Sequence, residues 1–453
     1  MNNFLEKCRG FFDGYLYPIS LGAIVLICHL LSLEFLAILL IFASVAFALV
    51  VYNDMRVAIS PILFILFSFS FDTYKSGWLK STAFLVLAII AIILFVSGVI
   101  AHLVINKKLS RFKKLHKSRL FIGFVALACA FLLNGFFNFK SYEAINFTFA
   151  LLLVLFLAVV FFLLYCGIEE REDTVEYLIF ILYVASLIVV LEMLAHLAFG
   201  DVVEGGRIIK ERLFLGWGAW NNVGGMLAML LPIHFYYAST KKHGYIYYGT
   251  AILTYITIVL TLSRSSLLFA SIVSAICVAI ICIKGSNKKI NRIITICLAG
   301  IALIGVIVLW NKISTLLSSY LNQGFDDNGR FNLYKHGVEN FLSHPIFGGG
   351  FGSCMEDHFG YPIDPNRYHN TFIELLATCG IVGFGAYVFH RYQTIKLVLE
   401  RKKQLSVVFL SLCIVALLLT SLLDNHFFNL YPTMFYSVIL CVIEKCSITD
   451  KQK

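Results

Sequence analysis

Residues 330–374 read RFNLYKHGVENFLSHPIFGGGFGSCMEDHFGYPIDPNRYHNTFIE and form the main part of the only long non-membranous segment in a chain of apolar runs. The stretch holds four histidines, two arginines, several acids and a glycine cluster. Polar side chains of this kind are costly inside a bilayer. The stretch therefore predicts a large loop outside the membrane, in which a membrane protein carries its chemistry.

Composition places most of the remaining chain in lipid. Of 453 residues, 60% are hydrophobic and 14% are charged, and the mean hydropathy is +0.86. A soluble protein of this length could not bury so much apolar surface. The N-terminal segment lacks a short apolar core followed by a small-residue cleavage site, so the first apolar run predicts a retained span.

Fourteen apolar runs are long enough, or nearly long enough, to cross a bilayer. The third is short and the ninth and tenth are nearly fused. The expectation is an all-α polytopic integral membrane protein with about 12–14 transmembrane helices and one long, partly helical external loop. The runs are 17–32, 35–52, 57–71, 82–105, 120–137, 144–166, 175–199, 218–239, 245–262, 265–283, 292–310, 371–390, 405–423 and 427–444.

The net charge of +10 is concentrated in short connectors, which indicates membrane topology rather than nucleic-acid binding. With the N-terminus inside, both termini are cytoplasmic, and the acidic loop 167–174 goes against the trend. The other predicted cytoplasmic loops are 52–56, 106–119, 240–244, 284–291 and 391–404. The predicted external loops are 72–81, 138–143, 200–217, a turn near Arg264, 311–370 and 424–426. Polar chemistry therefore collects on the outer face.

This topology divides the chain into four parts. The N-terminal helices occupy 1–199, and central helices with external arginine-bearing loops occupy 200–310. The long external loop is 311–370, and the C-terminal helices with a cytoplasmic tail are 371–453. Within the loop, apolar spacing predicts a helix on the membrane surface at 311–323.

The second half of the long loop has its own local signals. A helix is predicted from about Arg330 to Leu342, ending before Pro345. The following GGGFG permits a close backbone approach or a sharp bend.

His369 and Asn370 lie where the loop re-enters the membrane, and Glu374 lies about one turn further. An imidazole at this boundary can accept a proton near neutral pH, as an attacking acceptor hydroxyl requires. Spacing alone favours the alternative that His369 caps the helix or bonds a carbonyl.

Two arginines are candidates for binding an anion. Arg264 is a single charge in an apolar stretch of nearly forty residues, where a charge is more often functional than incidental. An anionic lipid headgroup would be its natural partner, although snorkelling to the interface is an alternative. Arg330 begins a helix, where N–H groups and a guanidinium suit phosphate oxygens, but an ion pair with Asp326 or Asp327 is an equal alternative.

Residues 205–225, GGRIIKERLFLGWGAWNNVGG, are a further candidate region. Its basic residues, Arg212 among them, precede a helix start that carries Asn222 at membrane depth, where an amide needs a partner in the protein or on a ligand. Glu192 and His196, four residues apart in one span, read as a buried mutual hydrogen bond or a proton relay. The acids and histidines of the loop show no metal-ligand spacing, so neither a metal nor a cofactor is predicted.

Four pieces in order resemble the O-antigen ligase and O-antigen polymerase superfamily of bacterial membrane glycosyltransferases. They are RLFLGWGAWNNVGGMLAMLLP, LTLSRSS, RFNLYKHGVENFLSHPIFGGGFG and RYHNTFIELLATCGIVGFGAY, within about 205–390. Two pieces depart from the family's usual pattern, with Trp-Asn-Asn in place of Asn-Pro-Asn around Asn222 and Ser265 in place of a glycine. The first half of the chain carries no motif of the family.

The resemblance implies metal-independent, inverting transfer of a glycan from an undecaprenyl-pyrophosphate carrier at the outer face of the bacterial cytoplasmic membrane. Arg264 and Arg330 would hold the pyrophosphate with help from Arg212, and His369 would activate the acceptor hydroxyl. Asn222, Asn370 and Glu374 would support the site. Membrane lipid and other polysaccharide-assembly proteins are the further partners it suggests.

Polymerase and ligase differ only in the acceptor, which is another lipid-linked repeat unit or a lipid core or other surface anchor. Nothing in the outer loops points to a core-lipid acceptor, which favours the polymerase. A transporter of lipid-linked sugars is the less favoured alternative, because no repeat is evident and the charges collect at the outer face.

Overall fold

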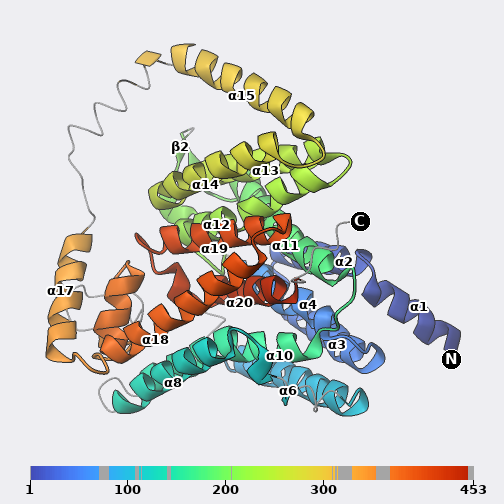
Figure 1. The fold of residues 1–453 in the computed structure, drawn as a ribbon, viewed down its shortest axis with the longest axis vertical. Helices are drawn as coiled ribbons and strands as arrows, with labels where there is room; N and C mark the ends of the chain where they lie inside the picture. The colour runs from blue at the N-terminus through green and yellow to red at the C-terminus, as the bar shows by residue number, and fades with distance from the viewer. Residues whose placement is uncertain are drawn as a thin grey trace.

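A computed structural model describes residues 2–70, 81–107, 112–113, 115–139, 144–205, 207–308, 310–311, 314, 329–353 and 368–446. The described chain is almost entirely helical, which confirms the expected all-α membrane class (Figure 1). The predicted surface helix at 311–323, Asp326 and Asp327 lie outside the described residues, apart from 311 and 314.

Each of the fourteen predicted apolar runs forms helical structure. The short third run is a broken element of α and 3-10 turns, as its length suggested. The helices of the N-terminal half are α1 (Asn2–Asp13), α2 (Leu16–Leu30), α3 (Glu34–Val51), η1 (Met55–Ala58), α4 (Ile59–Phe64), η2 (Ile65–Ser68), α6 (Thr82–Ile105), η4 (Leu115–Lys117), α8 (Phe121–Phe137), α9 (Ala144–Val154), η5 (Leu155–Val159), α10 (Val160–Gly167) and α11 (Thr174–Phe199).

A small hairpin and the C-terminal helices follow α11. The strands β1 (Val203–Glu204) and β2 (Arg207–Ile208) pair antiparallel. The helices are η6 (Lys210–Arg212), α12 (Trp220–Thr240), α13 (Gly244–Leu260), α14 (Arg264–Ile283), α15 (Lys288–Val308), α17 (Arg330–Ser343), α18 (Thr371–Arg401), α19 (Leu405–Thr420), η8 (His426–Phe428) and α20 (Leu430–Lys445). The predicted loop helix matches α17 closely.

Seven of the described helices are long and apolar enough to cross a membrane. The helices α1 and α2 bend by 77° at their junction and would make an eighth span if they act as one. Four further apolar helices are shorter, and including them reaches the lower end of the predicted count. The helix α15 lies at the edge of the bundle, where its apolar residues would face lipid (Figure 1).

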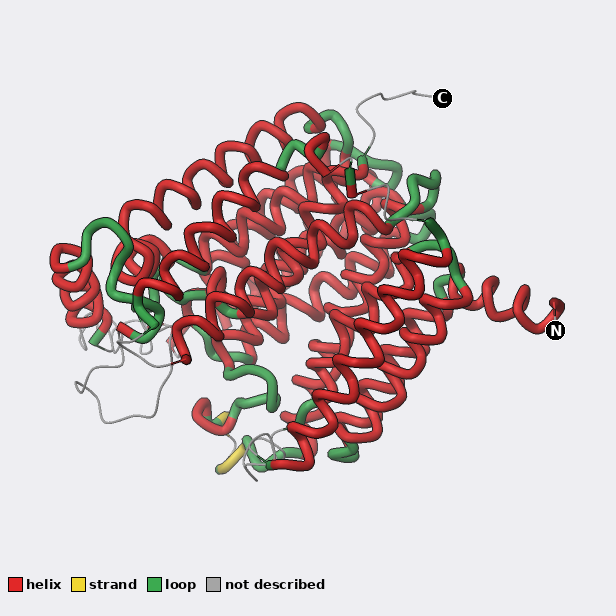
Figure 2. The backbone as a smooth tube through the Cα atoms, turned by 90° about the horizontal axis from the view of Figure 1, so that it is seen from below, coloured by secondary structure: helices red, strands yellow, loops and turns green. Residues whose placement is uncertain are grey.

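Loops that the charge pattern places on the same side of the membrane contact one another. Figure 2 shows the helices side by side, with the hairpin at one end of the bundle and α1 at the other. Predicted cytoplasmic loops meet through Arg56 with Asp173, Ser118 with Glu444, and Asn287 with Lys241. Predicted external segments meet through Ser32 with Ser70, Asn138 with Gly348, and Ser265 with Asp424. Which group of loops faces the cytoplasm stays a prediction.

The structure differs from the prediction at the end of α18. The connector expected at 391–404 is helical as far as Arg401. Arg391 is buried, and its guanidinium lies 4.6–4.7 Å from the ring centroids of Tyr387, Phe427 and Tyr436. Because three aromatic rings shield this cation, it is accommodated inside the bundle instead of marking a loop.

The helix α12 forms the centre of the fold and sets the position of the outer loops around it. It packs against α11, α13, α14 and α19, and most of its side chains are buried. At Gly225 a Cβ would collide with the ring of His426. This glycine therefore permits the loop between α19 and α20 to lie directly on α12.

Candidate active site

The start of α18 and the glycine-rich segment before it are bonded to each other. Gly380 has φ 61° and ψ −162°, so α18 is broken there. The N–H groups of Gly349 and Gly350 donate to the carbonyls of Ala377 and Thr378 at 2.8 and 3.0 Å. Residues just after the break donate back to the same segment. The predicted glycine bend is thus a close backbone approach that fixes the outer end of α18.

Three asparagines from α8 and α9 hold this segment from the other side. The bonds run from Asn134 Nδ2 to the Phe347 carbonyl (2.9 Å), from Asn138 Nδ2 to the Gly348 carbonyl (3.4 Å), and from the Gly352 N–H to Asn146 Oδ1 (2.7 Å). All three asparagines are buried. The N-terminal half, which shows no family motif, therefore helps to position the loop.

Replacing Gly380 with alanine is expected to destabilise the protein. The backbone conformation of Gly380 is essentially restricted to glycine and costs another residue about 1–3 kcal/mol, and a Cβ at Gly380 would also collide with the Ile346 carbonyl. The thermal unfolding midpoint in detergent should fall by several degrees. Gly385→Ala in the same helix is the control, because a Cβ there meets no atom within 4 Å. Equal midpoints for the two variants would contradict the proposed break.

His369 is held by Asp424, which lies in the loop between α19 and α20. The distance from His369 Nδ1 to Asp424 Oδ1 is 3.1 Å. Because an ionised carboxylate only accepts, Nδ1 carries the proton and Nε2 keeps a lone pair. The His369 side chain is 38% exposed, so the ring is accessible from outside the protein. The arrangement is that of a general base oriented by a carboxylate.

The backbone of His369 is also unusual. Its φ of 48° lies in the left-handed region, which is uncommon for a non-glycine residue and tends to cluster at functional sites. The capping role considered for His369 belongs to Asn370, whose side chain accepts from the N–H groups of Phe372 (2.9 Å) and Ile373 (3.2 Å). Asn370 Nδ2 also donates to the Leu422 carbonyl at 3.0 Å. Asn370 therefore frees His369 from capping and ties α18 to the Asp424 loop.

Asp424 is the centre of the polar cluster and is only 4% exposed. Burial alone would raise its pKa, but the hydrogen bond from His369 and the charges of His426, His369 and Arg330 outweigh burial and lower it. A lowered pKa keeps Asp424 ionised at neutral pH, and its pairing is lost only as the pH falls through that value. The carboxylate is therefore available to orient His369 under ordinary conditions.

Both predicted arginines lie at this cluster or next to it. Arg330 begins α17, and its guanidinium is 3.6 Å from Asp424 Oδ1. Arg264 begins α14, where its neighbour Ser265 donates to Asp424 Oδ2 at 2.9 Å. The serine that replaces the family's glycine thus ties the N-terminus of α14 to the same carboxylate.

Lys210 adds a third positive charge. It lies in η6, and its Nζ is 5.1 Å from the centroid of the Trp220 ring. Burial and the nearby charge of Arg264 lower the pKa of Lys210, and Arg330 acts in the same direction. The sequence shows Lys210 only as one of several basic residues before the helix start. Positive groups that repel one another in this way are stabilised when an anion binds between them.

Glu374 is buried and holds neighbouring residues of the cluster through hydrogen bonds. It is fully buried, and its Oε2 accepts from the Tyr368 N–H (3.1 Å) and from Asn425 Nδ2 (2.6 Å). It therefore links the residue before His369 to the residue after Asp424.

The other two predicted residues lie differently. Arg212 forms ion pairs with Asp201 (3.3 Å) and Glu204 (3.1 Å) in the hairpin region. Asn222 is half-buried in the first turn of α12, beside Gly218. Among the described contacts, neither residue touches Asp424. Lys210, in the neighbouring η6, is acted on by the charges of Arg264, Arg330 and Asp424.

Asp424 is the site residue that the sequence did not reveal. It appears in the sequence only as part of a short external connector, DNH, at 424–426. A carboxylate among apolar runs was the available signal, because such a group needs a partner. Within the described residues no three His, Cys, Asp or Glu side chains gather as a metal site. The expectation of metal-independent chemistry stays a prediction.

Comparison with protein families gives a match in the second half of the chain. Residues 249–388 match the family described as O-antigen ligase. This range contains Arg264, Arg330 and His369 and ends before Asp424. No curated protein matches the chain. This match confirms the resemblance for three of its four pieces, and the first piece, at 212–232, lies outside the matched residues.

Proposed function

We propose that this chain, which residues 249–388 place in the O-antigen ligase and polymerase superfamily, transfers a glycan from an undecaprenyl-pyrophosphate carrier to an acceptor hydroxyl. The reaction would take place at the outer face of the bacterial cytoplasmic membrane, with both termini in the cytoplasm. The observation that carries the proposal is the Asp424-centred cluster, in which an imidazole and a guanidinium share one buried carboxylate.

His369 is proposed as the general base. Nε2 would accept the proton of the acceptor hydroxyl while that oxygen attacks the anomeric carbon. The bond between this carbon and the phosphate oxygen breaks, and its electron pair leaves with the pyrophosphate carrier. Attack opposite to the leaving group inverts the anomeric configuration. Asp424 would stabilise the imidazolium as it forms, because it already accepts from Nδ1.

Arg264, Arg330 and Lys210 are proposed to bind the pyrophosphate. Charge builds on the leaving phosphate oxygens in the transition state, and fixed cations aimed at that charge stabilise it. Three cations supply the neutralisation that a divalent metal provides in other phosphate sites, which supports metal-independent transfer. Arg212, which is paired with two acids, is a weaker candidate for this role.

A groove between α18 and α19 is proposed to hold the lipid chain of the carrier. Its volume is about 710 Å³, its lining is largely apolar, and its outer end includes Thr371, Ser421 and Leu422. The Thr371 N–H donates to the Ser421 carbonyl next to His369 and Asn370. The groove therefore begins at the polar cluster and follows α18 into the membrane, as a lipid-linked donor requires.

Filling this groove is expected to weaken the use of long-chain donors. Val415 lines the groove and is partly exposed, so Val415→Trp should raise KM for a full-length polyprenyl donor about tenfold or more. A donor analogue with a short lipid should be used almost as before. Ile276→Trp on α14 is the control, because Ile276 is a similarly exposed apolar residue outside the groove. Equal KM values for the two variants would exclude this groove.

The test of the whole proposal uses purified protein and an undecaprenyl-pyrophosphate repeat unit. A ladder of product lengths is expected of a polymerase, the reading favoured because nothing in the sequence of the outer loops points to a core-lipid acceptor. Transfer only after a separate acceptor is added would identify a ligase. If no covalent product forms and the sugar instead crosses a vesicle membrane, both enzyme readings are excluded in favour of a transporter.

A further inference from the structure

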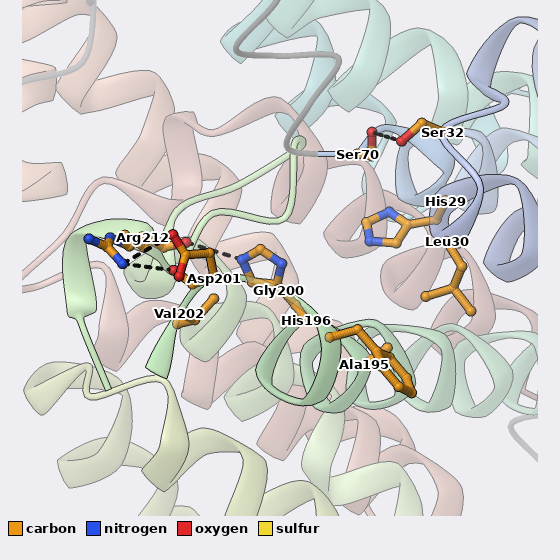
Figure 3. Close-up of a pocket in the computed structure, with 11 residues that line it drawn as sticks. His29, Leu30, Ser32, Ser70, Ala195, His196, Gly200, Asp201, Val202 and Arg212 are labelled. Atoms are coloured by element: carbon orange, nitrogen blue, oxygen red, sulfur yellow. Dashed lines mark hydrogen bonds and ion pairs between the residues drawn. The ribbon is translucent and has the colours of Figure 1, made fainter. Parts of the chain in front are cut away.

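A second polar pocket lies between α2, α11 and the hairpin, apart from the Asp424 cluster. Its volume is about 580 Å³, which is within the ~300–1,000 Å³ range of small-ligand pockets. It is formed by external segments, because Ser32, Ser70 and Gly200 all follow spans that end on the predicted outer side. The pocket is lined by His29, Leu30, Ser32, Ser70, Ala195, His196, Phe199, Gly200, Asp201, Val202 and Arg212 (Figure 3).

Two imidazoles face this pocket from opposite walls (Figure 3). His29 Nδ1 is 3.0 Å from the Phe69 carbonyl, and His196 Nε2 is 3.1 Å from the Arg212 carbonyl. Because a carbonyl oxygen only accepts, each of these nitrogens carries the proton of a neutral ring. This assignment leaves His29 Nε2 as an acceptor. Glu192, considered earlier with His196, accepts from Trp217 Nε1, and its Oε1 lies 4.0 Å from His29 Nδ1.

The two serines form a directed chain of hydrogen bonds. Ser70 Oγ donates to Glu34 Oε1 at 2.6 Å, and Ser32 Oγ lies 3.1 Å from Ser70 Oγ. Since the Ser70 proton points to the carboxylate, Ser32 is the donor to Ser70. The oxygen of Ser32 therefore keeps its lone pairs for a further donor.

The charged side chains at the pocket are one arginine and two acids. Arg212 supplies its cation, but the guanidinium is already paired with Asp201 and Glu204. A phosphate or carboxylate ligand would thus meet two acids beside the single arginine. A polyol suits this lining better, because its hydroxyls donate to acceptors such as Ser32 and accept from remaining guanidinium N–H groups. Phe199, 88% exposed at the rim, offers an apolar face to sugar C–H groups.

The short helix η6 connects this pocket to the active site. Lys210 at its start interacts electrostatically with Arg264, Arg330 and Asp424. Arg212 at its end lines the pocket. A saccharide in the pocket would therefore be separated from the proposed pyrophosphate site by the single turn of η6.

We propose that this pocket is a saccharide subsite that holds an uncharged part of the glycan beside the reacting end, either of the donor or of the acceptor. This inference rests on the proposed function for the identity of the glycan. The binding itself follows from a lining whose single arginine is already paired with acids, from the His29 and Ser32 acceptors, and from the exposed phenyl ring.

The test measures binding of a lipid-free, uncharged repeat-unit oligosaccharide to purified full-length protein. Ala195→Phe places a ring in the pocket and should weaken binding at least tenfold. Phe199→Ala should weaken it about two- to tenfold. The matched control is Ala198→Phe, which makes the same change on an exposed position of α11 that does not line the pocket. His369→Ala should bind as the wild type does, because it leaves the pocket unchanged.

Kinetics separate the two sources of the glycan. If Ala195→Phe raises KM for the acceptor alone, the pocket holds the acceptor, and if it raises KM for the donor alone, the pocket holds the donor. Unchanged oligosaccharide binding in Ala195→Phe would overturn the subsite. Binding of phosphatidylglycerol vesicles that Ala195→Phe weakens, with no binding of the oligosaccharide, would also overturn it and assign the pocket to a lipid headgroup. A wild type that binds sugar but transfers none would refute the proposed function and leave the subsite standing.

Discussion

Asp424→Asn is expected to reduce glycan transfer about 10²–10⁴-fold, the range that general acid–base catalysis contributes. Asp424 accepts from His369 Nδ1 and thereby keeps the lone pair on Nε2. An asparagine amide can donate to Nδ1, which would move the ring proton to Nε2 and remove the base. The loss should appear in kcat with the donor KM little changed, measured by product formation from a radiolabelled lipid-linked repeat unit.

Two further variants make this result specific. His369→Ala should be as inactive as Asp424→Asn, and the double variant should be no worse than either, because residues that act as a unit are not additive. Glu339→Gln removes an exposed carboxylate of α17 that pairs with Lys335, and it should keep full activity. Additive losses, or full activity of purified His369→Ala, would refute the paired base.

The helical fold could be predicted from the sequence because each predicted span is a continuous apolar run. Lipid leaves backbone groups no partner except within a helix, so a run of this length determines its own structure. The predicted loop at 391–404 was wrong because tertiary contacts, which the local pattern does not show, determine the structure there. Arg391 was assigned to a loop because it begins a basic connector of the kind found on the cytoplasmic side, and the sequence could not show the three rings that enclose it.

The site was visible in part for the same reason. Arg264, Arg330 and His369 belong to segments that match a known family, and the structure brings Arg330 and His369 to one carboxylate. Asp424 lies 55 residues after His369. Only packing brings the two together, because the loop that carries Asp424 rests on Gly225 of α12. Neither spacing nor periodicity encodes such a contact.

The asparagines Asn134, Asn138 and Asn146 show a further limit of local reasoning. Each looked like an isolated polar residue in or near an apolar run, and each bonds to the backbone of the segment 347–352, more than 200 residues later. Backbone groups carry no sequence signal of their own. A motif search therefore finds the segment and misses the residues that hold it.

Arg330→Ala and Arg264→Ala are each expected to lower kcat/KM about 10²–10³-fold, which corresponds to the loss of one donor aimed at developing charge. Arg330→Lys and Arg264→Lys should recover part of this, because a lysine restores the charge but not the planar fork that binds two phosphate oxygens. Inorganic pyrophosphate should inhibit the wild type and should inhibit both alanine variants more weakly. This second readout reports binding of the leaving group without depending on the base.

The control for this prediction is Lys335→Ala, which removes a cation from the same helix as Arg330, where the side chain is 77% exposed and outside the cluster. It should leave both transfer and pyrophosphate inhibition unchanged. If it weakened inhibition as strongly as Arg330→Ala, general surface charge would account for anion binding. If instead the arginine variants lost transfer while pyrophosphate still inhibited them as in the wild type, the two guanidiniums would not contact the leaving group. Arg330 would then act by holding Asp424, from which its guanidinium lies 3.6 Å away, and Arg264 through the position of Ser265.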